Sequence, residues 1–258
     1  MISKKTLIVL ALATTTVSGS ATAWQQGQIN DSINIEGHLT PPVSGNPWEV
    51  MLGNSVVGLD AELTSGQTSV DIPVTQNIPV LGIRTISNKA IPGTSGIIPQ
   101  ISYNNALDIS KFKDGRAPLT LEVKDSTDNV IGSLTVKLGV TGVQSVKESG
   151  WKANNLVYAT DKHRVFFGGV PYDPSMASKT DIAPTVFPGV NDNFDNQGLN
   201  WSTTGQGASF RQVGATYSGY YGAGIEPNQN ISISLNNTIP DNTQVAWKAS
   251  LPITVTYN

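Results

Sequence analysis

Apolar and polar residues alternate in two rows, one near each end of the chain. A period of two places each row on one face of an extended strand. A terminal strand is the part of a sheet that another chain can most easily complete, so the pattern favours assembly into polymers over catalysis. The first row is Ile29, Ile33, Ile35 and Leu39, interrupted by Asp31 and Gly37; the second is Ala249, Leu251, Ile253, Val255 and Tyr257.

Alternating rows also recur through the middle of the chain, separated by turn sequences such as Ser65-Gly66 and Pro92-Gly93. Short alternating strands separated by such turns predict an all-β antiparallel sandwich. No long segment has a helical period, and no sequence repeat or linker divides the chain. The rows are Val70, Ile72 and Val74; Leu119, Leu121 and Val123; Leu134, Val136, Leu138 and Val140; and Ile231, Ile233 and Leu235.

Residues 170–207 depart from this order. The stretch is rich in Pro, Asn, Asp and Gly and shows no clear alternation. We expect a long irregular excursion from the sandwich, and long loops on a rigid scaffold often carry recognition.

The first 23 residues have the form of a cleaved secretory signal peptide. Lys4 and Lys5 precede a short apolar stretch, and Ala21-Thr22-Ala23 is a small-residue cleavage site. The mature chain would start at Trp24, with residues 24–40 as an N-terminal extension and residues 41–258 as one domain. Its 14 basic and 19 acidic residues give a net charge of −5, which disfavours nucleic acid as a partner.

The chain contains no cysteine. An exported chain without disulfides has to be stabilised by its own core or by pairing with other chains. The mature length, about 235 residues, is enough for one β-sandwich with a sizeable core.

Several local sequences together resemble the chaperone–usher fimbrial subunits, and in particular the kappa-class adhesive fimbriae of enterobacteria. The C-terminal run, with an aromatic residue in the penultimate position, is the most specific of them. The matching segments are Trp24; Gly27 to Leu39; Trp48-Glu49 before Gly53; Leu81-Gly82-Ile83 with Arg84-Thr85; Ile98 to Ile101; Phe166 to Gly169; and Trp247 to Tyr257.

The resemblance implies an incomplete immunoglobulin-like sandwich that lacks its last strand. A periplasmic chaperone would fill the resulting groove, along Trp247 to Asn258, until an outer-membrane usher exchanges that strand for the N-terminal extension of the next subunit. The donor residues would be Ile29, Ile33, Ile35, Gly37 and Leu39. The mature chain would then be part of a fimbria on the cell surface. On its own, the N-terminal row also fits an ordinary first strand of its own domain.

Residues suited to catalysis or metal binding are sparse. His38 and His163 each follow an acid by two residues, which makes neither a catalytic triad nor a metal site. The loop with Asp192, Asn193, Asp195 and Asn196 lacks the glycine and glutamate of a calcium hand. We therefore expect no cofactor, no metal and no enzymatic activity.

Aromatic residues could bind host glycans, because an exposed ring can stack on a sugar face. Tyr217, Tyr220 and Tyr221 fit strand residues packed under the excursion better than a binding surface. Trp201 is the stronger, though weak, glycan candidate. Two alternatives to a purely structural subunit remain open: a subunit that is itself an adhesin, and a secreted β-sandwich lectin that does not polymerise.

Overall fold

The computed structural model describes residues 45–258, so the predicted leader and the 24–40 extension lie outside the described residues. The regular secondary structure of the described part is nearly all β-strand, in a sandwich-like arrangement with open sheets, which confirms the predicted all-β class. Its α-helix has four residues, and no helix there is long and apolar enough to cross a bilayer. The strands are β1 (Trp48–Leu52), β2 (Ser69–Pro73), β3 (Ile78–Thr85), β4 (Ile91–Pro92), β5 (Pro99–Ser102), β6 (Arg116–Lys124), β7 (Val130–Glu148), β8 (Trp151–Tyr158), β9 (Gly205–Gln206), β10 (Thr216–Ile225), β11 (Asn230–Leu235), β12 (Lys248–Ala249) and β13 (Thr254–Tyr257). The helices are α1 (Ala183–Val186) and the 3-10 helices η1 (Ile109–Lys111) and η2 (Pro174–Met176).

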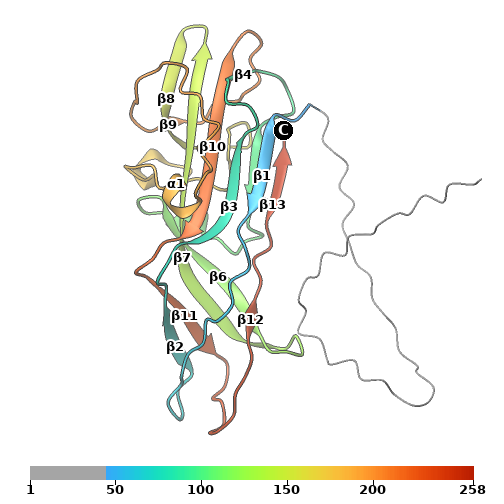
Figure 1. Ribbon diagram of the computed structural model, residues 1–258, viewed down its shortest axis with the longest axis vertical. Coiled ribbons are helices and arrows are strands. Elements are labelled where there is room, and N and C mark those ends of the chain that lie inside the picture. Colours follow the sequence, from blue (N-terminus) through green and yellow to red (C-terminus); the bar gives the residue numbers. More distant parts are fainter. Residues whose placement is uncertain (1–44) are drawn as a thin grey trace, which may run out of the picture. The chain divides into compact units, whose positions relative to one another are not determined.

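Strand β7 is the scaffold of the large sheet, because its 19 residues pair with four other strands. Strands β10 and β11 follow one another along one edge of β7, and β8 and β6 share the other edge. One half of the sheet therefore runs β8-β7-β10-β3-β1, and the other half runs β12-β6-β7-β11-β2 (Figure 1).

The four predicted rows in the middle of the chain point into the core, as expected. In β6, for example, Leu119 and Val123 are buried, whereas Thr120 and Glu122 between them are exposed. The alternation ends in the second half of β7 and in β10, where consecutive residues are buried. There the irregular segment between β8 and β10 covers the second face of the sheet.

A cluster of aromatic side chains joins the large sheet to the two-stranded sheet β5–β13. Trp48 of β1 packs edge-on against Phe166 and donates its indole N–H to the carbonyl of Ile97 at 2.6 Å. The hydroxyls of Tyr103 and Tyr221 are 2.8 Å apart, and both rings are buried. These contacts span both layers, so the small sheet is fixed to the core although it forms no continuous ladder with the large sheet.

Residues 159–215, between β8 and β10, contain the predicted 170–207 excursion. Helix α1 in this segment lies directly on β10 at Gly222, where a Cβ atom would be 2.7 Å from the Cβ of Ala183. The buried hydroxyl of Thr141 on β7 donates to Asp181 at 2.7 Å and accepts the backbone N–H of Ala183 at 2.8 Å. A further anchor is Arg84 of β3, which donates to the carbonyl of Gly189 at 2.6 Å. Polar contacts thus fix the segment to the sheet.

We expect Thr141→Val to lower the free energy of unfolding by about 1–3 kcal/mol, because it leaves Asp181 and the N–H of Ala183 without this partner. Chemical denaturation of the purified full-length chain measures the effect. Thr120→Val is the matched control, since Thr120 lies on the exposed face of β6. Equal stability of the two variants would show that Thr141 does not anchor the segment.

Candidate functional site: an open groove along the C-terminal segment

The C-terminal segment has a regular burial pattern that none of the internal strands shares. From Val245 to Tyr257 every odd-numbered residue is half-buried and every even-numbered residue is exposed. From Trp247 onward the odd-numbered residues pack against the core. None of the odd-numbered side chains is fully covered. A row that faces a core yet stays partly open lacks cover on one side. The row contains the predicted groove-edge residues Ala249, Leu251, Ile253, Val255 and Tyr257.

The predicted continuous strand from Trp247 to Asn258 is wrong in one respect. The structure has two short strands instead, with β12 paired to β6 and β13 paired to β5. Pro252 lies in the gap between them and has no N–H for a ladder. The side chains keep their alternation across this gap, because the backbone stays extended while it passes from one sheet to the other.

One edge of β13 is free among the described residues. Asn258 and Ile98 exchange two backbone hydrogen bonds at 3.1 Å. Such bonded pairs recur at every second residue of an antiparallel ladder, so the backbone groups of Thr256 and Thr254 also face β5. In an antiparallel ladder the residues between such pairs point their N–H and C=O groups the other way. The backbone groups of Val255 and Tyr257 therefore face the free edge.

A groove runs beside this segment. We call residues 55–67 its N-terminal wall and residues 239–249 its C-terminal wall. Two adjoining pockets of about 690 and 640 Å³ lie between these walls and share residues of both. The floor consists of apolar side chains of the predicted rows and their neighbours: Val70, Ile72, Leu119, Leu121, Val123, Ile131, Leu134, Val136, Ile225, Ile231, Ile233 and Leu235.

The backbones of both walls are largely unpaired within the described chain. Residues 53–64 contain no strand, and the backbone hydrogen bond from Gln67 N–H to the Thr64 carbonyl is local to the wall. The C-terminal wall likewise has no strand before Lys248, and its bond from Thr243 to the Pro240 carbonyl is local. Unpaired backbone on both sides of an apolar floor is the arrangement that an added β-strand would complete.

The two walls run antiparallel. Asp60 and Val245 line the same part of the groove. Asn46, which precedes the N-terminal wall, lies next to Tyr257, which follows the C-terminal wall. Burial raises the pKa of the Tyr257 hydroxyl, and a hydrogen bond with Asn46 opposes that rise. Tyr257 thus lies next to the point where the described chain begins.

The other sequence-based candidates fall into three groups. The donor residues Ile29, Ile33, Ile35, Gly37 and Leu39, and also His38, lie outside the described residues. The tyrosines of β10 are buried, whereas Trp201 is 52% exposed, so its glycan contact stays a prediction. Asn193 donates to the carbonyls of Thr85 and Ile86, and Asp195 accepts the N–H of Ala90; within residues 45–258 no three His, Asp or Glu side chains converge as a metal site would need.

The sequence analysis missed the N-terminal wall. A signal for it is present, because Val57, Leu59, Ala61 and Leu63 alternate with Gly58, Asp60 and Glu62 as in a strand with one covered face. The adjacent strand β1 extends toward the wall.

Comparisons with known proteins agree with this geometry. The model of the family described as "Fimbrial, major and minor subunit" matches residues 3–258. The K88 fimbrial protein AD of Escherichia coli is 30% identical over 288 residues, which cover 98% of this chain and 99% of that protein. The K88 fimbrial proteins AC and AB of the same organism are 30% and 29% identical, with equal coverage. The chain belongs to this fimbrial subunit family, and it is a structural subunit of a surface fimbria.

We expect Val255→Pro to reduce the amount of fibre on the cell surface strongly, because proline removes an N–H from the free edge without touching the ladder to β5. Thr256→Pro is the comparison, since it removes a bond to β5 and should lower the stability of the chain by about 1 kcal/mol or more. Fibre yield and circular dichroism of each variant measure the two effects. Normal fibre yield from a folded Val255→Pro chain would show that this edge is not used in assembly.

Proposed function

We propose that the groove is completed by a strand from another polypeptide. In the fibre this strand would be residues 24–40 of a neighbouring copy; before assembly it would be a strand of a periplasmic chaperone, exchanged at an outer-membrane usher. The observation that carries this proposal is the half-buried C-terminal row beside a backbone edge without a partner among the described residues.

The sequence of the extension suits the groove. Its four large aliphatic side chains could enter the apolar floor, each contributing about 1.5–3 kcal/mol of burial. Hydrogen bonds to both walls would add affinity, and the spacing of the row would set the register. Gly37 fits a place where the floor is shallow and the backbone alone approaches it.

The same groove explains a need for an assembly partner. An uncovered apolar groove with two unpaired backbone walls promotes aggregation. A chaperone strand would prevent this in the periplasm, which the chain would reach through the signal peptide at residues 1–23. In this scheme the protein acts through assembly, contributes to cell adhesion as part of the fibre, and has no enzymatic activity.

We expect Ile33→Asp to abolish polymers that resist denaturant, because an unpaired carboxylate in an apolar pocket costs several kcal/mol. Asn34→Asp is the matched control: it adds the same charge on the opposite face of the extended segment. Gel electrophoresis of unheated fibres distinguishes the two variants. Denaturant-resistant polymers of the Ile33→Asp chain would refute the role of residues 24–40.

A second experiment supplies the strand in cis. Residues 24–40 fused through a flexible linker after Asn258 should stabilise a chain that lacks its own extension and should make it a monomer, because a tethered strand loses little association entropy. Asn258 is paired with Ile98 next to the free edge, so the fused strand starts beside the groove. Thermal unfolding and gel filtration compare the chain with and without the fusion. Equal melting temperatures with two monomeric chains would mean that the groove needs no added strand.

A further inference from the structure

A second apolar surface lies on the outer side of the N-terminal wall. Large hydrophobic side chains that are exposed gather in residues 50–57, whereas the others in the described chain are dispersed. Contiguous exposed apolar surface of this kind marks an interaction site more often than chance placement does. The exposed side chains in this stretch are Val50, Met51, Leu52, Val56 and Val57. Val50 and Leu52 pair with the core-facing Ile83 and Leu81 and so lie on the core face of β1, whereas Met51 pairs with Gly82 and lies on the opposite face, toward Phe187.

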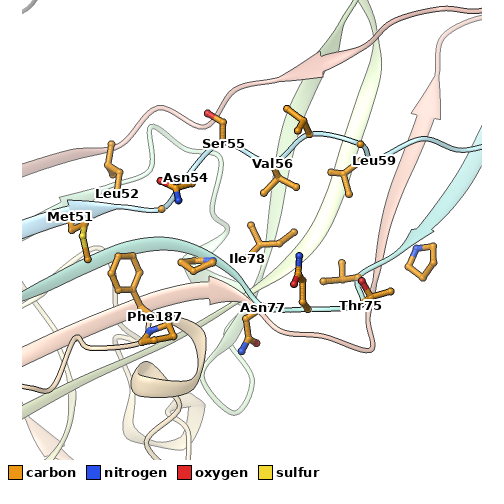
Figure 2. A pocket seen from close by; sticks show the side chains of 18 residues that line it. Met51, Leu52, Asn54, Ser55, Val56, Leu59, Thr75, Asn77, Ile78 and Phe187 are labelled. Atoms are coloured by element: carbon orange, nitrogen blue, oxygen red, sulfur yellow. The ribbon is translucent and has the colours of Figure 1, made fainter. Parts of the chain in front are cut away.

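All of these residues except Val50 line a trough of about 580 Å³. One side of the trough is residues 51–59 and the other is residues 73–79, with Phe187 and Pro188 at one end. Figure 2 shows Met51 and Phe187 at that end, and Leu59 and Thr75 at the other. Phe187 is held against β3 because Gly82 leaves room for its ring; a Cβ there would lie 2.6 Å from the Phe187 Cε1 atom.

The lining of the trough determines what kind of partner fits. None of the 18 lining residues has a charged side chain. A surface of apolar side chains that is depleted in charged residues is typical of the centre of a protein–protein interface. An anionic lipid surface or a nucleic acid would need basic residues instead. The partner is therefore an uncharged protein surface.

The trough adjoins the groove directly. Residues 55–59 and Ile78 line both. A partner that occupies the groove is thus placed next to the trough.

The length of the N-terminal extension limits how far away that partner's body can lie. Leu39 ends the donor row, and the described domain begins at Gly45. Six residues span at most about 20 Å. A neighbouring copy whose extension fills the groove must therefore dock its folded body close to the groove.

We propose that the trough is covered in the fibre by the folded body of the neighbouring subunit that donates its extension to the groove. This contact rests on the proposed strand addition but involves different residues. It would add a second interface between the same two subunits, and that interface would restrict how one subunit tilts relative to the next.

Single cysteines test this contact, since the chain has no cysteine of its own. Met51 is 58% exposed and lines the trough but not the groove, so M51C reports on the trough alone. I86C is the matched control: Ile86 is 54% exposed and follows β3 at the opposite end of the β1–β3 pair.

Fibres sheared from cells that produce each full-length variant are labelled with a maleimide, before and after complete dissociation. We expect the M51C thiol in intact fibres to react at about a tenth of its rate after dissociation or less, because an interface core excludes water and reagent. The I86C thiol should react at similar rates in both states. Protection of M51C with a reactive I86C supports the contact.

An M51C thiol that reacts as fast as I86C in intact fibres would overturn the proposal. Failure of strand addition is recognised separately. It would appear as denaturant-resistant polymers of the Ile33→Asp chain, a result that does not depend on labelling at the trough.

Discussion

A β-strand has hydrogen-bonding groups on two edges, and the described residues use one edge of β13. The unpaired edge is next to a row of apolar side chains that the chain's own core covers only halfway. The open groove and its unpaired walls lie along the same segment as this unsatisfied edge, and the proposed strand addition would complete all of them.

The rest of the fold keeps the groove open instead of letting it collapse. Strand β7 carries floor residues in its first half and anchors the irregular segment through Thr141 in its second half. The aromatic cluster around Trp48 fixes β1 against the small sheet, and Tyr257 meets Asn46 at the same end. The two walls are thereby positioned at their ends, while their middle parts stay available for pairing.

The sequence predicted the floor well and the walls poorly, and the reason is physical. Rows such as Leu119 to Val123 alternate because one face packs on the core of their own chain. Residues 57–63 alternate in the same way but form no strand, because that segment has no backbone partner in the described chain. Pro252 separates β12 from β13 although the side-chain pattern passes across it unchanged. In β10 the pattern vanishes because the segment after β8 covers its outer face, a tertiary effect that local periodicity does not contain.

The length of β7 has a mechanical consequence. The strands that contribute to the groove floor, β6 and β11, are hydrogen-bonded to opposite edges of its first half, and β8 and β10 to opposite edges of its second half. A pull along β7 would therefore load these ladders in shear, with many hydrogen bonds resisting together, and would not peel them apart one by one. A chain without a single disulfide can in this way transmit tension along its length through non-covalent bonds alone.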